Sequence, residues 1–424
     1  MNAYRSCVAP MLAAVAGLAA GACSLSPKEE LGRQIFNDEV LSANKNQACA
    51  ACHGEDTGGT GPSMKFNAHG AVYEGSFPGR FGNRKPPSSA YATLAPRFDH
   101  DAEVGFVGGN FWDGRATGWR LGNPAADQAQ GPFLNPVEQA LPGAAELVAR
   151  VCAADYGRLF RDVWGPEACS DAEQGYVDIA LSIAAFEGSR EVNRFSSKYD
   201  AFRTRQARLD PIERRGLKLF TGRAQCANCH VIEGDPPLFT DFTFDNLGIP
   251  LNPENPFYGM DEVIVDEEPV NSAGAEWRDP GLGGFLRTLA SDPTWRSLPY
   301  VSSALLDMTG ETLTDLASEN LGKHRVPTLR NVDKRPSREF VKAYGHNGYF
   351  KSLKGIVHFY NTRDILPRCE GPLTEAEALA QDCWPAPEID QNVNTDELGN
   401  LGLSDAEEDA LVAFMATLSD ERSR

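Results

Sequence analysis

Two copies of one short motif decide the fold of this chain: Cys-Ala-Ala-Cys-His at residues 49–53 and Cys-Ala-Asn-Cys-His at residues 226–230. In such a motif the two thiols add to the two vinyl groups of one haem, and the adjacent histidine places an imidazole nitrogen beneath the iron. A zinc site would require four ligands, and a dithiol redox site would not require the histidine. We therefore expect two covalent c-type haems. Their attachment residues are Cys49, Cys52, Cys226 and Cys229, and their iron ligands are His53 and His230.

The sequence before each motif also repeats. Gly-Arg-Gln-Ile-Phe at residues 32–36 leads into the first motif, and Gly-Leu-Lys-Leu-Phe at residues 216–220 leads into the second. In each copy an apolar pair ends a short predicted helix. The motif histidines lie 177 residues apart (230 minus 53), which is enough chain for one domain each. We expect a mainly α-helical fold of two cytochrome-c-like domains, residues 23–208 and 209–424, each with long ordered loops around one haem.

Helical periodicity is clearest in the second half of the chain. Two segments carry apolar residues at helical spacing, and the second follows a capping box that begins at Ser404. These apolar residues are Leu353, Ile356, Val357 and Tyr360 in one segment and Leu411, Phe414, Met415 and Leu418 in the other. A further helical stretch is expected near residues 171–206, whereas strand signals are few. Residues 54–135 and 232–300 are rich in proline and glycine, which predicts long ordered loops that pack around a haem.

Composition and the first residues indicate where the protein works. The chain has 424 residues and a net charge of −19, which argues against nucleic acid and anionic lipid as partners. Ordinary solubility is the simpler interpretation of this charge. Residues 1–22 place Arg5 ahead of an apolar stretch too short to span a membrane, which is typical of a secretory signal peptide. We expect a periplasmic protein. Ala-Gly-Ala before Cys23 also forms a weak lipobox, so a lipid anchor at Cys23 is the alternative to simple cleavage.

Cysteine spacing predicts disulfides. Of the ten cysteines, two lie in or beside the signal and four belong to the haem motifs. The remaining four form two pairs close in sequence, Cys152 with Cys169 and Cys369 with Cys383. In an oxidising compartment we expect two disulfides, each closing a loop within one half of the protein. Four buried free thiols are the alternative.

Longer motifs lie between and after the haem motifs. They are Asn-Phe-Trp-Asp-Gly-Arg at residues 110–115, Gln-Ala-Gln-Gly-Pro at 128–132, Asn-Pro-Val-Glu at 135–138, Arg-Val-Pro-Thr-Leu-Arg-Asn-Val at 325–332 and Gly-His-Asn-Gly at 345–348. In sequence and in order they resemble the bacterial dihaem cytochrome c peroxidases and MauG proteins. The resemblance covers nearly all of the mature chain.

The resemblance implies a division of labour between the haems. In that family the N-terminal haem is the peroxide site and the second haem is the electron-transfer site. A tryptophan lies between them, and a glutamine and a glutamate line the peroxide pocket. The matching residues are Trp112, Gln128 and Glu138, and the ten-residue spacing of the last two fits the family. An insertion at residues 118–124 separates Trp112 from Gln128 and changes the expected path of that loop.

A carboxylate in the peroxide pocket also has a chemical reason. Peroxide cleavage at a ferric haem requires a proton to move from the near oxygen to the far one. Glu138 can move it, because burial in an apolar pocket raises a carboxyl pKa. A helix-start carboxylate after Pro136 is the alternative for Glu138. His69, sixteen residues after His53, matches the family's distal ligand of the first haem, and a pocket or loop histidine is the alternative.

The resemblance becomes narrower at the second haem. The position fourteen residues after His346 holds an axial methionine in the electron-transferring peroxidases and a tyrosine in MauG and MbnH. Here it is Tyr360, so the chain resembles the MauG and MbnH branch, with Tyr360 as distal iron ligand of the second haem. A phenolate is a hard anionic donor that stabilises ferric and higher states. A core tyrosine is the alternative, and Met308, His324 and His358 are less favoured ligands.

The family also binds one Ca²⁺ between its domains. The matching ligands are the Asn83 side chain and the carbonyl groups of Val341 and Ala343, and carbonyl oxygens suit calcium. MauG carries a surface tryptophan six residues before the second motif histidine, where this chain has alanine. A path for oxidising equivalents to the surface would therefore use another aromatic residue. The candidates are Trp277, Trp295 and Trp384.

Three functions follow as hypotheses. The first is a MauG-like enzyme that uses hydrogen peroxide to form high-valent haem iron and oxidises a protein partner at long range, with tryptophan residues among its targets. The second is a conventional dihaem cytochrome c peroxidase that reduces hydrogen peroxide with electrons from a small periplasmic carrier. The third is an electron-transfer cytochrome without enzymatic activity. Tyr360 favours the first over the second, and Gln128 with Glu138 argues against the third.

Overall fold

Helices dominate the computed structural model, which describes residues 24–421, so the predicted signal peptide and Cys23 lie outside the described residues. The helices of the first half are α1 (Pro27–Phe36), α2 (Met64–Asn67), α3 (Pro124–Leu134), α4 (Ala144–Ala153), α5 (Gly157–Trp164) and α6 (Ala172–Glu187). Those of the second half are α7 (Lys198–Arg203), α8 (Pro211–Phe220), α9 (Gly281–Ser291), α10 (Ser303–Leu306), α11 (Gly310–Glu319), α12 (Leu353–Thr362), α13 (Glu375–Ala380) and α14 (Asp405–Ala416). The strands pair antiparallel as β1 (Asp99–Asp101) with β2 (Gly105–Val107), β3 (Phe244–Asp245) with β6 (His324–Arg325), and β4 (Ile264–Val265) with β5 (Glu268–Pro269).

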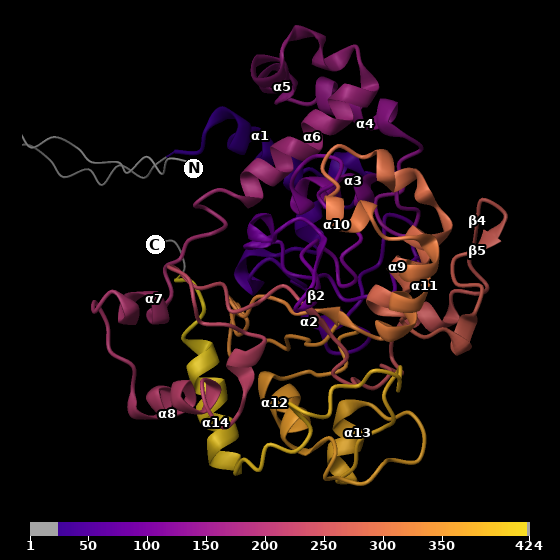
Figure 1. Cartoon of the computed structure of the whole chain (residues 1–424). Coiled ribbons are helices and arrows are strands. Elements are labelled where there is room, and N and C mark those ends of the chain that lie inside the picture. The colour runs from indigo at the N-terminus through magenta and orange to yellow at the C-terminus, as the bar shows by residue number, and fades with distance from the viewer. Residues whose placement is uncertain (1–23, 422–424) are drawn as a thin grey trace, which may run out of the picture.

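A close helix crossing precedes each haem motif (Figure 1). In the first half α1 crosses α6, and a Cβ atom added at Gly32 would lie 1.9 Å from the carbonyl oxygen of Ser182. In the second half α8 crosses α14, and a Cβ atom at Gly216 would lie 1.9 Å from the carbonyl oxygen of Ala410. Only glycine allows two backbones to approach this closely. The repeated Gly-x-x-x-Phe sequences therefore form two matching helix pairs, each leading into a Cys-x-x-Cys-His segment.

Each helix pair has its own apolar core. The first is built on α1, α4 and α6, and its fully buried members include Leu31, Leu147, Val151, Phe160 and Ile179. The second is built on α8, α12 and α14, and its fully buried members include Phe220, Phe350, Phe359, Leu411 and Phe414. The two segments with predicted helical periodicity are α12 and α14, and both supply residues to this second core, which confirms their predicted role.

A third apolar core forms around α9 and α11. The insertion at residues 118–124 contributes Trp119 to it. The Trp119 ring lies 5.2 Å from that of Trp295, and its Nε1 donates a hydrogen bond of 2.8 Å to the Phe98 carbonyl. The insertion is thus anchored to the helical segment of the second half. Neither this core nor α9 was expected, because residues 232–300 were predicted to be loop.

Contacts between distant segments join the two halves. The Tyr91 hydroxyl donates to Asp420 near the end of the chain at 2.6 Å, and the Asn331 side chain donates to the same carboxylate at 3.0 Å. Buried Arg330 donates two hydrogen bonds to Asp200, at 2.8 and 3.0 Å. The predicted domain boundary at residues 208 and 209 lies between α7 and α8. It stays a prediction, and the contacts of Tyr91 with Asp420 and of Asp200 with Arg330 cross it.

Local sequence signals mark the helix ends more accurately than our expected ranges did. The capping box of Ser404 with Glu407 is confirmed at the start of α14. The helix expected near residues 171–206 is shorter: α6 ends at Glu187, and polar residues without apolar periodicity separate it from α7. Helix α3 lies within a predicted loop, although Asn123 caps it and Pro124 occupies its first turn, both ordinary start signals.

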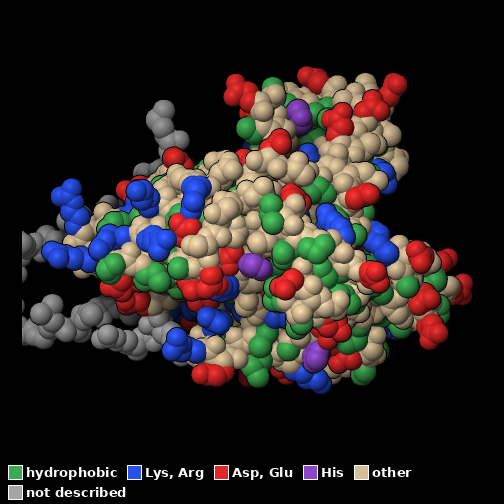
Figure 2. All heavy atoms as spheres, turned by 90° about the horizontal axis from the view of Figure 1, so that it is seen from below, with side chains coloured by type: hydrophobic (Ala, Val, Ile, Leu, Met, Phe, Trp, Pro, Cys, Tyr) green, Lys and Arg blue, Asp and Glu red, His purple; other side chains and the backbone are tan. Residues whose placement is uncertain are grey.

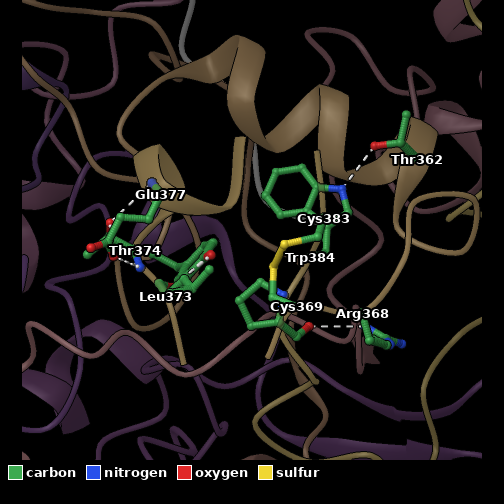
Figure 3. The surroundings of a disulfide bond; sticks show 10 residues. Thr362, Arg368, Cys369, Leu373, Thr374, Glu377, Cys383 and Trp384 are labelled. Carbon is green, nitrogen blue, oxygen red and sulfur yellow. Dashed lines mark hydrogen bonds between the residues drawn. A yellow bond between two sulfur atoms is a disulfide. The ribbon is translucent and has the colours of Figure 1, made fainter. Parts of the chain in front are cut away.

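Both predicted disulfides are present. Cys152 bonds Cys169, and Cys369 bonds Cys383, so the alternative of four free thiols is wrong. Figure 3 shows the second disulfide beside Trp384, whose Nε1 donates to the Thr362 hydroxyl at 3.0 Å and so ties this loop to α12. Within residues 24–421, the helices are all too short or too polar to cross a membrane. On the face seen in Figure 2, acidic and basic side chains are interspersed.

Candidate functional site

The two motif histidines are held in the same way. The Nδ1 atom of His53 lies 2.9 Å from the Gly59 carbonyl oxygen, and the Nδ1 atom of His230 lies 2.9 Å from that of Phe239. A carbonyl can only accept, so in each ring Nδ1 carries the proton and Nε2 is left for a metal. Burial lowers the pKa of both histidines, which favours the neutral, ligating form. Backbone carbonyls thus orient both predicted iron ligands.

A mainly apolar cavity of about 220 Å³ opens at the second motif. Cys226, Cys229 and His230 line it from one side, and Tyr360 on α12 lines it as well. Burial, and after it the nearby Cys226 thiol, raises the pKa of Tyr360 well above its ordinary value. Met415 on α14 also lines the cavity, whereas the sequence analysis placed it only on the apolar face of its helix. Tyr360 therefore lies in the cavity, where a ligand of the second haem would have to lie. This position is compatible with its place on the apolar face of α12.

Glu138 lies near the first motif. Its charge contributes to the raised pKa of both Cys49 and Cys52, so the carboxylate and the two thiols are close. Burial raises the pKa of Glu138, while the Arg115 guanidinium and a 2.9 Å hydrogen bond from the Asn135 amide lower it in part. Glu138 occupies a turn after α3 and precedes no helix directly, so the helix-start alternative is wrong.

Trp112 connects segments from both halves. Its indole Nε1 donates a hydrogen bond of 2.8 Å to the Lys85 carbonyl, and its own carbonyl accepts one of 2.8 Å from the Arg325 amide. Trp112 is buried and lines the cavity of the second motif. The charge of Lys85 in turn lowers the pKa of His53 in the first motif. Trp112 thus contacts residues that adjoin both motifs, and its predicted position between the haems stays a prediction. Gln128 is half-buried on α3, the helix that leads to Glu138.

Two buried cations adjoin Trp112, and sequence reasoning missed both. Burial lowers the pKa of Lys85 to about 8 and that of Arg325 to about 10. The Lys85 ammonium donates to the Thr60 hydroxyl at 2.9 Å and to the Pro86 carbonyl at 3.2 Å. The internal repeat was a signal for both, because each lies two residues before a proline. The carbonyl of that proline, Pro87 or Pro327, forms a hydrogen bond with the motif histidine of its half.

His69 is placed at the surface. About two-thirds of its side chain is exposed, and its Nδ1 lies 2.9 Å from Glu254 Oε1. This arrangement does not support the predicted role of His69 as a distal haem ligand, because the ring is engaged by a surface carboxylate. A local spacing of sixteen residues from His53 could not foresee a partner 185 residues away.

The other candidate ligands of the second haem differ from Tyr360 in their surroundings. The Nδ1 atom of His358 lies 2.9 Å from the buried carboxylate of Glu408. Met308 packs against the third core. His324 does line the cavity, but its ring stacks on that of His346 with centroids 3.6 Å apart. Of these four candidates, Tyr360 and His324 line the cavity, and the ring of His324 is already stacked on a neighbour.

The structure brings the predicted calcium segments together without deciding their role. The Lys85 amide donates to the His346 carbonyl at 2.9 Å, which joins the Asn83 segment to the turn that contains Val341 and Ala343. The Val341 carbonyl accepts a hydrogen bond of 3.1 Å from Asn67. The calcium site stays a prediction.

The three candidate exit tryptophans lie in different places. Trp384 is fully buried, and Phe359 links it to Tyr360, with ring centroids 5.1 Å from Trp384 and 6.3 Å from Tyr360. Trp295 belongs to the third core. Trp277 is half-buried and packs on Phe257. Among these three tryptophans, and within the described part of the chain, only Trp384 is connected to a predicted iron ligand by aromatic contacts.

The residues of both motifs suit covalent haem. Each offers two thiols in sequence register, a histidine whose Nε2 is free, and mainly apolar surroundings in which a haem can be buried. The donor sets fit a c-type haem in both halves.

Comparison with known proteins agrees with this geometry. Residues 26–208 match the family model of di-haem cytochrome c peroxidase. The methylamine utilization protein MauG of Paracoccus denitrificans is 31% identical over 98% of this chain and 95% of its own length. Cytochrome-c peroxidase IdrP1 of Denitromonas iodatirespirans is 25% identical over 92% of this chain and 81% of its own. The crystal structure of the diheme peroxidase BthA from Burkholderia thailandensis has 27% identity and a TM-score of 0.68, covering 94% of this chain and 87% of that chain.

The match to MauG spans nearly the whole chain, and so covers both of its halves. Coverage on this scale, together with the shared fold, extends the relationship beyond the N-terminal half matched by the family model. The chain therefore belongs to the dihaem cytochrome c peroxidase and MauG family, within its MauG-like branch, and is a peroxide-dependent oxidoreductase.

Proposed function

We propose that this enzyme uses hydrogen peroxide to oxidise residues of a protein partner at long range, with tryptophan side chains as candidate targets. The observation that carries the proposal is the place of Tyr360 in the cavity that Cys226, Cys229 and His230 line. A tyrosine ligand would stabilise ferric and higher states, which suits a store of oxidising equivalents better than an ordinary electron carrier. The sequence match to MauG supports the same choice.

The first motif is the proposed peroxide site. When bound there, the haem supplies the iron at which peroxide reacts. Glu138 then takes a proton from one peroxide oxygen and returns it to the other, and its raised pKa suits both steps. Gln128 would orient peroxide or water by a hydrogen bond. Asn135 and Arg115 keep Glu138 from becoming too weak an acid to release the proton.

Trp112 is the proposed bridge for electrons between the two sites. Its indole N–H donates to the Lys85 carbonyl, and an amide carbonyl is too weak a base to remove that proton. Trp112 can therefore lose and regain an electron without moving a proton, which keeps the transfer rapid and reversible. From the second site, Phe359 and Trp384 offer an aromatic route away from Tyr360.

We further propose that the protein works in the periplasm. Two disulfides within the described chain support an oxidising compartment. The predicted signal peptide at residues 1–22 and the alternative lipid anchor at Cys23 lie outside the described residues.

Near-infrared spectroscopy of the diferric holoprotein tests the proposed function. One equivalent of peroxide should produce a charge-resonance band, the signature of two haems that share oxidising equivalents. Tyr360→Phe should abolish this band, because it removes the oxygen donor. The matched control is Tyr349→Phe, which removes a hydroxyl that donates to the Leu373 carbonyl at 3.1 Å and should leave the band intact.

Two outcomes would contradict the proposal. If the wild-type protein gives no band and rapidly turns over a reduced small cytochrome, the chain is a conventional peroxidase. If Tyr360→Met leaves the midpoint potential of the second haem unchanged, Tyr360 is not its ligand, because a thioether should raise that potential.

A further inference from the structure

Lys85 and Arg325 are equivalent positions of the internal repeat, and they flank one side chain. Lys85 lies two residues before Pro87, whose carbonyl forms a hydrogen bond with His53. Arg325 lies two residues before Pro327, whose carbonyl forms a hydrogen bond with His230. The carbonyl of Lys85 accepts the Trp112 indole N–H, and the amide of Arg325 donates to the Trp112 carbonyl. The Lys85 ammonium lies 5.9 Å from the centre of the Trp112 ring. Two cations, one from each half, thus adjoin the residue between the motifs.

Both cations are buried without an acidic partner among the hydrogen bonds and ion pairs of the described chain. The exposed fraction is 7% for Lys85 and 9% for Arg325. The Lys85 ammonium has two neutral acceptors for its three N–H groups, Thr60 and Pro86. Arg325 has five side-chain N–H donors, and within the described chain its side chain makes one long hydrogen bond, 3.4 Å from Nε to the Phe111 carbonyl. Burying a charge is costly unless it is paired and hydrogen-bonded.

Neighbouring buried cations are satisfied, which makes these two unusual. Arg84 binds Asp113 at 2.6 Å and Asp279 at 2.6 Å, and Arg330 binds Asp200. Lys342 donates to three backbone carbonyls, those of Thr57, Asn331 and Lys334, at 2.8, 2.8 and 3.2 Å. Arg330 and Lys342 line the same cavity as Lys85 and Arg325, but only the latter two lack such partners among the described residues. An anion bound in the cavity would supply the missing partner.

A haem brings such an anion, because its edge carries two propionate carboxylates. The thiols of Cys226 and Cys229 would fix one edge of the second haem, and Arg325 lines the same cavity. Lys85 lines this cavity too, but it belongs to the first half of the chain and its charge also reaches His53 of the first motif. We propose that Arg325 binds a propionate of the second haem and that Lys85, its counterpart, binds a propionate of the first. Trp112 then lies between two ion pairs, one for each haem. This inference rests on the two haems of the proposed function, but not on the partner that they oxidise.

The inference predicts which haem each cation controls. Removing a positive charge beside an iron favours the ferric state, since that state is the more positive one. Arg325→Gln should lower the midpoint potential of the second haem by about 59 mV or more, which is a tenfold change in the ferrous-to-ferric ratio of a one-electron couple. The first haem should move much less. Lys85→Met should instead lower the midpoint potential of the first haem and change that of the second much less. Arg325→Lys should restore most of the potential that the second haem loses in Arg325→Gln.

Redox titration of the holoproteins, followed by electron paramagnetic resonance, measures both potentials separately, because the two ferric haems differ in axial ligation. The matched control is Lys351→Met. The Lys351 ammonium donates to the Gly348 carbonyl at 2.7 Å and does not line the cavity, so both potentials should stay at wild-type values. Unchanged potentials in Arg325→Gln, or equal shifts of both haems in Arg325→Gln and Lys85→Met, would overturn the assignment.

A second measurement covers a failure of Arg325→Gln to fold. Resonance Raman bands of the propionate groups should shift in the gentler variant Arg325→Lys, and unshifted bands would overturn the proposal. A haem assay must first show two covalent haems per chain in every variant. A wild-type protein that lacks the near-infrared band but shows the predicted potential shifts would refute the proposed function and leave this inference standing.

Discussion

The crossing of α8 and α14 provides a sharp structural test through Gly216→Ala. A Cβ atom there would lie 1.9 Å from the Ala410 carbonyl oxygen and 2.7 Å from the Phe414 Cβ atom, whereas real Cβ contacts essentially never fall below 3.0 Å. The clash involves backbone, so a change of rotamer cannot relieve it. The two helices must separate by about 1 Å to restore contact at about 3 Å.

Two effects oppose each other in this variant. Overpacking of this kind costs about 1–3 kcal/mol, and the severity of the overlap places it near the upper end. Alanine is a better helix former than glycine by up to about 1 kcal/mol. The net loss should be about 2 kcal/mol, which lowers the Tm of a unit of this size by about 4–8 °C. Because α14 carries Met415 into the cavity, the absorption of the second haem should change as well.

Thermal unfolding followed by haem absorption and circular dichroism measures both consequences. Gly32→Ala, at the equivalent crossing of α1 and α6, should cause a similar loss and affect the first haem instead. The matched control is Gly259→Ala, because this glycine is exposed and a Cβ atom there meets nothing within 4 Å. Its stability should change by less than about 0.5 kcal/mol. If Gly216→Ala unfolds at the same temperature as Gly259→Ala with unchanged haem bands, the close crossing is refuted.

Three further predictions concern acids and disulfides. Glu138→Gln should slow the reaction with peroxide about 10²–10⁴-fold while the ferric spectrum stays unchanged. In the wild type the rate should fall as the pH drops through the raised pKa of Glu138. Stopped-flow rates near those of the wild type in the variant would contradict the proton-transfer role. Burial raises the pKa of Glu187 to about 8, and one of its carboxyl oxygens has no hydrogen-bond partner among the described residues. The folded state therefore holds this proton more tightly than the unfolded state, and the free energy of unfolding falls as the pH rises from about 4.5 to about 8. Glu187→Gln should therefore match the wild type in urea unfolding at about pH 5 and exceed it by more than about 1 kcal/mol at about pH 9, and equal stability at both would refute this burial. Replacing Cys152 and Cys169 together with serine should cost about 3 kcal/mol, measured by urea unfolding, because this disulfide closes a loop of 17 residues; an unchanged midpoint would mean that the bond does not constrain the chain.

Features that depend on neighbouring residues were predictable from the sequence. The Cys-x-x-Cys-His motifs place thiols and histidine side by side through covalent connection alone. The capping box at Ser404 and the periodicity of α12 were read correctly for the same reason, since helix signals repeat every three or four residues. The disulfide pairs were also correct, because they join cysteines close in sequence.

Other features depend on distant segments. The ligand role of His69 stays a prediction, and its ring lies at the surface beside Glu254, 185 residues away in the chain. The stretches predicted as loops contain α3 and α9, because expectations from proline and glycine content outweighed the capping signals of Asn123 and Pro124. The third core, where Trp119 of the insertion meets Trp295, could not be foreseen from either segment alone.

The sequence by itself determined the two disulfides and the duplicated helix pair and predicted two covalent haems, because covalent chemistry and helical spacing are local properties. Only the tertiary structure decided how charges are distributed around Trp112. Lys85 and Arg325 lie 240 residues apart in the chain (325 minus 85), and neither stands out in its own segment. Both are buried beside Trp112 without an acidic partner among the described residues, and burial is a property of the folded chain as a whole.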